Sequence, residues 1–264
     1  MFFLCCFLSI TIWQHLNAEE NTEDPVIKDC RLAIVAIGPK PPRRFGKNQS
    51  ESSNGASTLL PPRIGELPPR KLMINLGDRH STTNVNYNSK PTFITIPSNK
   101  RLNWREKSEQ EKDYLTVEEL DPSSVNLILL SASSLSPFRW SSKPKQFKLD
   151  LTSAAFQYKR LAFINLSKRP IKSKYDEKEV LLRPGQKCLH SILIDRNLHK
   201  VSAYYGSVEK TIFNSAVKFN KSKSIKLFIF YDANANTNDG RTVGLMRLRI
   251  DIHEELEKLV TKTP

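Results

Sequence analysis

The sequence predicts a mostly β protein, built as two small antiparallel β-sandwich or open-barrel domains in tandem, with little helix. Apolar runs of strand length recur along the chain, and Pro, Gly, Ser and Asn separate them. Several runs alternate apolar and polar residues, while no long stretch keeps the 3.6-residue period of a helix. If residues 1–18 are removed as a signal, 246 of the 264 residues remain, which suits two such domains better than one.

The N-terminus, MFFLCCFLSITIWQHLNAEE, predicts a signal peptide over residues 1–18. Its apolar run from Phe2 to Trp13 is shorter than the roughly 20 residues that cross a bilayer, and a cleavage site fits after Ala18. We therefore expect an exported protein, periplasmic or extracellular, with no transmembrane span in the mature chain. The alternative is a membrane anchor formed by the uncleaved N-terminal segment.

The remaining organisation follows from the apolar runs. We expect an acidic leader (19–30), a first β domain (31–133), a Ser/Pro-rich linker (134–145), a second β domain (146–252) and a short C-terminal tail (253–264). The clearest strand runs are LAIVAI (32–37), TFITI (92–96), VNLILL (125–130), FKLDL (147–151), LAFINL (161–166), CLHSILI (188–194), KVSAYY (200–205), SIKLFIFY (224–231) and VGLMRLRIDI (243–252).

The tail holds the best helix candidate, His253 to Val260, because Leu256, Leu259 and Val260 would share one face. A tandem design is also suggested by LMINLGDR (72–79) and AFINLSKR (162–169), which share Ile-Asn-Leu and a basic residue. Chance similarity is the alternative for so short a match.

The first β domain contains a Pro/Arg-rich loop, residues 39–71, in which Pro-Pro-Arg occurs three times. Paired prolines favour an extended polyproline II path that leaves backbone carbonyls free to accept hydrogen bonds. Four arginines on this path are candidates for a partner-binding site: Arg43, Arg44, Arg63 and Arg70. The structural alternative is a long loop along the domain edge, where Pro discourages strand pairing.

The net charge limits the classes of partner. The chain has 41 Lys and Arg against 27 Asp and Glu, a formal charge of +14, and all of these residues follow residue 18. Outside the cytoplasm, such a charge favours anionic envelope polymers, lipid head groups or an acidic protein. Because the basic residues are scattered and mixed with acids, a dispersed, solubilising surface is the competing interpretation. A nucleic-acid partner is expected only if the chain is not exported.

The mature chain would keep two cysteines, Cys30 and Cys188. In an oxidising compartment, such a pair suggests a disulfide that closes a long loop and stabilises the fold by about 4 kcal/mol. The alternative is two separate buried thiols, since free cysteine is among the most buried residue types.

Two tryptophans lie in aromatic-basic clusters, Trp104 beside Arg105 and Trp140 beside Arg139. Such clusters can stack on sugars or bases, and we include Trp104 and Trp140 among the candidate partner-binding residues. The alternative is that each ring anchors a small β domain or a domain junction.

No metal, cofactor or catalytic site is predicted. Asp232, Asn234 and Asn236 alternate ahead of Asp239-Gly240, but Thr237 and Val243 occupy the positions where a calcium loop needs Gly and an acid. Because Asp-Gly is a strong hairpin signal, we expect a turn between two strands. The few histidines form no His-x-x-x-His pair, and His190 is expected to be a partly exposed strand residue.

Several stretches carry a resemblance: the signal peptide, the first strand leading into PKPPRRF, the later PPR, then LAFINLSKRPI, LLRPGQ, YYGSV and KLFIFYDA. Together they resemble a group of uncharacterised exported bacterial proteins that are β-rich in two halves. The resemblance implies export and this architecture, and it assigns no activity to any residue.

The sequence therefore predicts an exported, non-enzymatic binding or structural protein of the cell envelope. It would recognise an anionic polymer or a protein partner through a basic surface, without a cofactor. The alternative is a hydrolase of envelope polysaccharide or peptide, whose acidic residues would come from separate loops.

Overall fold

A computed structural model describes residues 29–41, 43–46, 58–75, 80–98, 101–106, 113–132, 140–158, 160–175, 178–190, 196–218, 224–233 and 243–260. Over these residues the chain is mostly β, with nineteen strands and two helices. Most neighbouring strands are antiparallel, and no sheet in the described part closes into a barrel. The predicted fold class, a mostly β chain with little helix, is confirmed.

Four sheets form the body of the protein. The first inner sheet has the order β11 (Lys145–Asp150), β10 (Val125–Ser131), β1 (Asp29–Ile37) and β6 (Asn86–Tyr87), and β7 (Ile94–Pro97) also pairs with β1. The first outer sheet has the order β5 (His80–Asn84), β4 (Lys71–Asn75), β8 (Leu102–Glu106) and β9 (Asp113–Val117). The second inner sheet has the order β15 (Lys187–His190), β12 (Leu161–Asn165), β18 (Ser224–Asp232) and β19 (Val243–Asp251). The second outer sheet has the order β14 (Lys178–Leu182), β13 (Ile171–Tyr175), β16 (Arg196–Tyr205) and β17 (Val208–Lys218).

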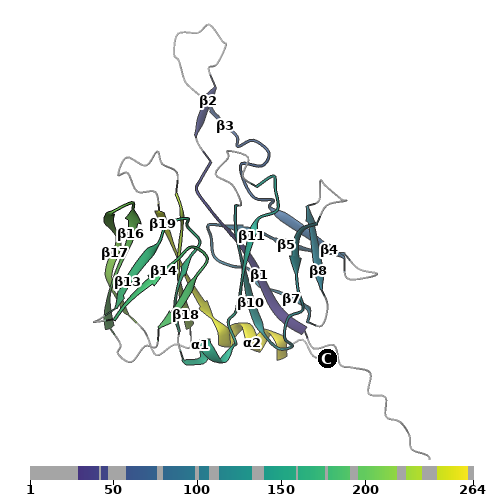
Figure 1. Ribbon diagram of the computed structural model, residues 1–264. Helices are drawn as coiled ribbons and strands as arrows, with labels where there is room; N and C mark the ends of the chain where they lie inside the picture. The colour runs from purple at the N-terminus through teal and green to yellow at the C-terminus, as the bar shows by residue number, and fades with distance from the viewer. Residues whose placement is uncertain are drawn as a thin grey trace, which may run out of the picture.

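Three smaller elements complete the fold. The strands β2 (Arg44–Gly46) and β3 (Thr58–Leu60) form a hairpin that projects from the body (Figure 1). Helix α1 (Ala154–Tyr158) follows β11, and helix α2 (Ile252–Val260) follows β19. Figure 1 shows the four sheets as successive layers, with the inner sheets in the middle and both helices at one end.

The same strand topology occurs twice. Each half of the chain has a set of eight strands that hold the same sheet positions in the same chain order, and a helix follows each set. The first set is β1, β4, β5, β7, β8, β9, β10 and β11, and the second set is β12 to β19. In each inner sheet the first strand of the set pairs in parallel with the seventh and antiparallel with the fourth. We call the halves repeat 1 (β1 to α1) and repeat 2 (β12 to α2).

Strand register aligns the two repeats residue by residue. RLAIVAI (31–37) in β1 corresponds to RLAFINL (160–166) in and beside β12. SVNLILL (124–130) corresponds to SIKLFIF (224–230), and the two parallel pairings then have the same register. The chain is therefore a tandem repeat at the level of backbone pairing.

A β-bulge marks the same point in both outer sheets. The register shifts after Trp104 in β8, which lies opposite Leu115, and after Val201 in β16, which lies opposite Phe213. The repeat expected between residues 72–79 and 162–169 is wrong in register, because it would align β4 with β12, which hold different positions. Four matching residues were too few to fix the alignment.

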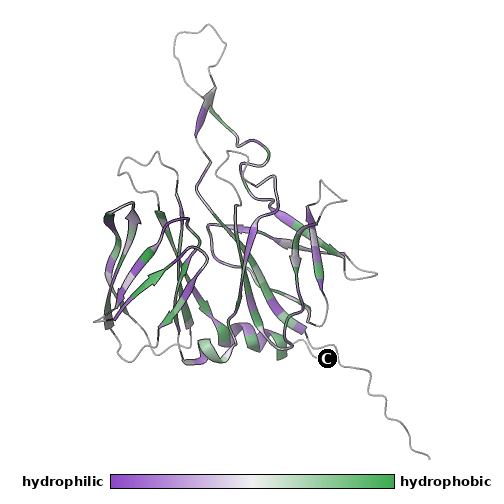
Figure 2. Cartoon of the chain, in the orientation of Figure 1, coloured by the Kyte–Doolittle hydropathy of each residue, from purple (hydrophilic) through white to green (hydrophobic). Residues whose placement is uncertain are grey.

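Three apolar clusters fill the spaces between the layers. One lies within repeat 1 and one within repeat 2, each between an inner and an outer sheet. The third lies between the two inner sheets, and both repeats contribute side chains from equivalent positions to it. These equivalent positions are Ala33 and Ala162, Val35 and Ile164, Val125 and Ile225, Leu127 and Leu227, Leu129 and Ile229, Leu149 and Leu248, Leu151 and Ile250. Inner strands are thus covered on both faces, which explains the long apolar stretches along them (Figure 2).

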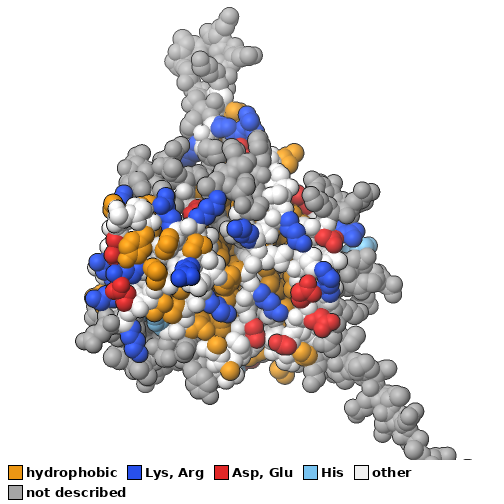
Figure 3. All heavy atoms as spheres, in the orientation of Figure 1, with side chains coloured by type: hydrophobic (Ala, Val, Ile, Leu, Met, Phe, Trp, Pro, Cys, Tyr) orange, Lys and Arg blue, Asp and Glu red, His pale blue; other side chains and the backbone are white. Residues whose placement is uncertain are grey.

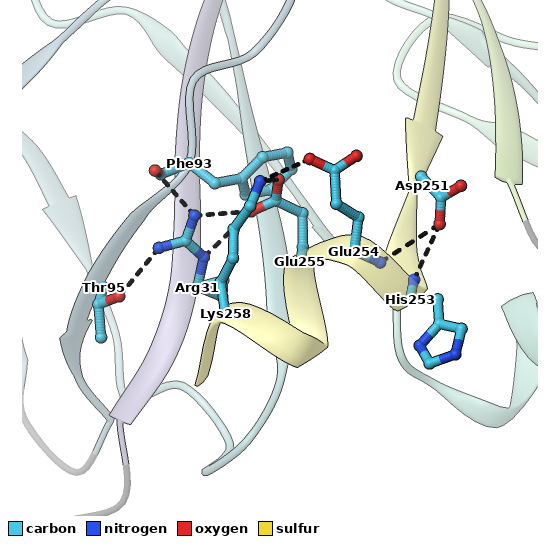
Figure 4. A network of polar contacts seen from close by, with 8 residues as sticks. All are labelled: Arg31, Phe93, Thr95, Asp251, His253, Glu254, Glu255 and Lys258. Atoms are coloured by element: carbon cyan, nitrogen blue, oxygen red, sulfur yellow. Dashed lines mark hydrogen bonds and ion pairs between the residues drawn. The ribbon is translucent and has the colours of Figure 1, made fainter. Parts of the chain in front are cut away.

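Helix α2 connects the end of repeat 2 to repeat 1. Arg31 on β1 donates to Glu255 Oε2 from Nε (3.1 Å) and Nη2 (2.7 Å), and it also donates to Thr95 Oγ1 and the Phe93 carbonyl (Figure 4). Asp251 caps the helix by accepting the His253 N–H at 3.1 Å. The C-terminal helix therefore fixes one repeat to the other through a charged contact as well as through the central core.

Each of the nine strand runs predicted from the sequence overlaps a strand, although residues 191–194 of CLHSILI lie outside the described residues, and the predicted C-terminal helix is α2. Two features differ from expectation. The central pairs β1–β10 and β12–β18 are parallel, because the chain returns to each first strand in the same direction after five intervening strands of the set. Strand β11, placed by the sequence in the second domain, pairs with β10, so the second repeat begins at β12 rather than after residue 145.

Candidate functional site

The Pro/Arg-rich loop contains the projecting hairpin of β2 and β3. Arg44 makes an ion pair with Glu66 at 3.0 Å, and Glu66 also accepts the Arg63 backbone N–H at 2.7 Å. Because the Glu66 side chain is only 4% exposed, this carboxylate holds the loop in place and Arg44 has a structural role. Arg43, Arg63 and Arg70 are exposed. Glu66 thus binds the side chain of Arg44 and the backbone of Arg63.

The two candidate tryptophans are both in the interior. Trp104 is fully buried in the core of repeat 1, and Trp140 is 2% exposed. Trp140 packs edge-on against Tyr87, with ring centroids 6.1 Å apart. The backbone N–H of Trp140 donates a hydrogen bond to the Gly65 carbonyl. Neither indole face is open to a ligand in this structure, which agrees with the packing alternative.

The cysteines do not form the expected disulfide. Cys30 and Cys188 are not bonded to each other, since Cys30 lies within the core of repeat 1 and Cys188 packs against the core of repeat 2. The central core lies between these two clusters, so the alternative of separate thiols is the correct one. Sequence spacing could not show this, because it carries no information on which face each cysteine occupies.

The segment that suggested a metal loop lies mostly outside the described residues, since residues 234–242 are not among them. Asp232 is described, and its carboxylate accepts the Lys168 backbone N–H at 3.1 Å. Among the described residues, no three His, Cys, Asp or Glu side chains are placed to share a metal ion. The expectation for His190 was wrong, because the side chain is 8% exposed and lies beside Phe163.

The best candidate site is a groove between the edge strands β17 and β19, on the open side of repeat 2. It has a volume of about 430 Å³. Its nine lining residues are Phe213, Ser215, Ala216, Val217, Lys226, Phe228, Arg247, Leu248 and Arg249. Three of these are cationic and none is acidic, so the groove combines an apolar lining with positive charge.

Strand alternation explains this composition. In β18, Ile225, Leu227 and Ile229 face the central core, so Lys226 and Phe228 face the interior of repeat 2. In β19, the buried Leu248 separates the exposed Arg247 and Arg249 in the same way. Because β19 is the last strand of its sheet, its arginines lie at the exposed edge of repeat 2 and not in the apolar core between the sheets.

Arg247 connects the two walls of the groove. Its guanidinium carbon lies 5.0 Å from the ring centroid of Phe213 on β17 and 6.0 Å from that of Phe228 on β18. These distances are those of cation–π contacts, which hold the guanidinium between the two rings. The charge is therefore positioned by aromatic side chains of both sheets.

Two further cations face each other across the strand pair. Lys226 lies directly opposite Arg249 in the β18–β19 register, and like charges at such positions repel. Burial, and then the nearby charge of Arg249, lower the pKa of Lys226. Arg249 Nε donates to Ser224 Oγ at 3.1 Å, which orients the guanidinium. An anion in the groove would relieve this repulsion.

Repeat 1 shows that the fold does not require these charges. By strand register, Asn126 and Asp150 hold the positions of Lys226 and Arg249. The equivalent edge in repeat 1 therefore has an acid where repeat 2 has an arginine. Figure 3 shows hydrophobic side chains interspersed with Lys and Arg on the viewed face of repeat 2.

Sequence reasoning missed the groove residues. The pattern RLR in β19 did place Arg247 and Arg249 on one face, and Lys226 was the single cation in a strand otherwise covered on both sides. Which face was open could not be read from either strand alone, because that depends on the position of β17.

No protein-family model matches the chain, and no curated protein matches it in sequence. Within the part of the chain that the structure describes, no helix has the length and apolar character needed to cross a membrane.

Proposed function

We propose that this chain is an exported, non-enzymatic binding protein of the cell envelope, and that its groove between β17 and β19 recognises an extended acidic segment of a protein partner. The observation that carries the proposal is the combination of three cations and two phenylalanines in a groove without an acidic lining residue. The formal charge of +14 supports an anionic partner, since long-range attraction speeds association.

An extended segment suits the walls of the groove. Both β17 and β19 are edge strands, and the outer side of each backbone pairs with no other strand in the described part. A peptide strand can add to such an edge through main-chain hydrogen bonds. Alternate side chains of the added strand would then enter the groove, since strand side chains point to opposite faces in turn.

The groove lining specifies what those side chains would be. Acidic groups would meet Lys226, Arg247 and Arg249, while apolar groups would pack on Phe213 and Phe228. We therefore expect a segment whose inward positions include both acidic and apolar residues. Because the arginines are exposed, the affinity is expected to fall as the salt concentration rises.

The test compares two variants with the same change in charge. Lys226→Asn with Arg249→Asp introduces the residues that repeat 1 carries at these positions and lowers the net charge by three. Arg43→Ala with Arg63→Ala and Arg70→Ala lowers it by three in the Pro/Arg-rich loop, without touching the Arg44–Glu66 ion pair. The probe is a fluorescent peptide of about eight residues in which Glu and Val take turns at every second position, with Thr at the positions between them, and its binding is followed by anisotropy.

The groove variant is expected to bind the peptide at least about tenfold more weakly, a difference of about 1.4 kcal/mol, while the loop variant keeps nearly full affinity. A peptide with the same composition in two blocks should bind less well, because it cannot place acids in register. Equal loss in both variants, or loss only in the loop variant, would refute the groove as the site. No binding by the native protein would refute recognition of extended acidic segments altogether.

The envelope location needs its own measurement. Native protein should be recovered with the envelope fraction and released by salt, and the groove variant should be released at lower salt. Recovery of the native protein in the cytosolic fraction would contradict the proposal.

A further inference from the structure

A cysteine and a histidine lie in contact on β15, at the opposite edge of the second inner sheet from β19. The two residues are separated by one position, so their side chains lie on the same face of the strand. Cys188 Sγ is 3.5 Å from His190 Nε2, and Cys188 is partly exposed. Cys188 thus has an imidazole as its neighbour and lies, partly exposed, on an edge strand.

Aromatic contacts hold the histidine in this place. The His190 ring stands edge-on to Phe163, with centroids 5.2 Å apart, and the ring of His199 is 6.1 Å away. Burial, with the charge of His190 as a smaller cause, lowers the pKa of His199 to about 4. His199 therefore stays neutral near pH 7 and leaves His190 as the imidazole that can take up the thiol proton.

The fold itself does not need this pair. Strand register places Ile94 of repeat 1 at the position of His190, and Thr92, which precedes β7, is two residues before Ile94, as Cys188 is before His190. Ile94 packs against the core of repeat 1 as a plain apolar residue. Repeat 1 thus has a hydrocarbon where repeat 2 has the imidazole, so the fold is built in repeat 1 without a Cys–His pair at this strand.

Cys30 provides a contrast within the same chain. It is fully buried, and burial together with the charge of Asp29 raises its pKa to about 12. A thiol with such a pKa is almost entirely protonated near neutral pH and is a poor nucleophile. Of the two described cysteines, Cys188 is the one that is partly exposed and has a neighbouring imidazole.

We propose that Cys188 and His190 form a reactive thiol site that takes small disulfides, of the cystine or glutathione disulfide class, and becomes a mixed disulfide. The Cys188 S–H proton passes to His190 Nε2, and the thiolate attacks one sulfur of the disulfide. A Cys188–S–S–R bond forms, the bond between the two ligand sulfurs breaks, and the leaving thiolate takes up the proton from His190. This site is independent of the groove and does not rest on its function.

The first test uses the native full chain and a chromogenic aromatic disulfide, with mass spectrometry to locate the modified cysteine. Cys188 is expected to react while Cys30 stays unmodified, and Cys188→Thr should abolish the reaction. The rate of Cys188 should reach half its maximum clearly below pH 8.5, the ordinary value for a free cysteine. A half-maximum at or above that pH would overturn the proposal, as would a faster reaction at Cys30.

The second test separates the base from a structural role. His190→Ile introduces the residue found at the equivalent position of repeat 1 and should slow the reaction at pH 7 by about tenfold, since only about 3% of an ordinary thiol is ionised there. At a pH where the thiol ionises unaided, the native and variant rates should agree. Unchanged rates at pH 7, or equal slowing at both pH values, would overturn the role of His190. His190→Gln provides the same comparison if the isoleucine variant folds poorly.

Discussion

Replacing Glu255 with Ala should lower the free energy of unfolding by about 3 kcal/mol. The Arg31 and Glu255 side chains are 8% and 12% exposed, and breaking a buried ion pair by removing one partner costs about 3–5 kcal/mol. The lower end applies because Arg31 keeps two neutral acceptors, Thr95 Oγ1 and the Phe93 carbonyl. The helix α2 would then lose its ion pair with repeat 1.

Glu254 provides a matched control one position away. Its carboxylate contacts Lys258 at 2.8 Å, as that of Glu255 does, but its side chain is 66% exposed. An exposed pair of this kind contributes about 0.3–0.5 kcal/mol, so Glu254→Ala should be nearly neutral. The two variants remove the same chemical group from the same helix and differ mainly in burial.

Urea unfolding followed by tryptophan fluorescence measures the difference, because Trp104 and Trp140 are buried in repeat 1, where α2 docks. A double-mutant cycle with Arg31→Met isolates the coupling between the two charges. If Glu255→Ala costs no more than Glu254→Ala, or if the coupling energy is close to zero, the ion pair does not fasten α2 to repeat 1 and the reasoning fails.

Two further predictions concern single positions. Because the pKa of His199 is lowered from 6.5 to about 4, the unfolded chain binds more protons between these values, so stability is lost as the pH falls from 6.5 to about 4. His199→Leu, with the residue that repeat 1 has at Leu102, should remove up to about 3 kcal/mol of this loss in urea unfolding measured at both pH values; equal pH dependence in both proteins would contradict the lowered pKa. Gly65→Ala should destabilise by at least about 1 kcal/mol more than Gly185→Ala, because both glycines have φ of +80° but only a Cβ at Gly65 meets Ser141 Oγ, at 2.0 Å. Equal shifts in melting temperature would contradict the close approach.

The strands were predictable because their signal is local. In β19, the alternation of Met246, Leu248 and Ile250 with arginines fixes both the strand and its buried face, and the structure confirms each. The helix α2 followed from Leu256 and Leu259 in the same way. Strands such as β13 and β17 escaped attention because their apolar residues are few and interrupted by Lys, Ser and Asn.

The candidate site was less accessible to sequence reasoning. The arginines of the Pro/Arg-rich loop were conspicuous, yet Arg44 is held by Glu66, 22 positions later in the chain. The cations of the groove were inconspicuous, because each has an apolar residue on both sides of it in the sequence. The arginines that were conspicuous in the sequence are therefore not the ones that form the site. The groove cations and phenylalanines come from three strands, and they meet only after the strands have paired and the two sheets have packed together.

The sequence by itself determined that the chain is mostly β, where its clearest strands lie, and which side of each alternating strand is apolar. These properties depend on the two-residue period of the strand and on neighbouring residues. Only the tertiary structure decided that the strands repeat as two sets of eight, that Cys30 and Cys188 lie in separate cores, and that Lys226, Arg247 and Arg249 line one groove. Those outcomes depend on strand order and register, which are set by contacts between segments up to about a hundred residues apart and leave no mark on any single stretch.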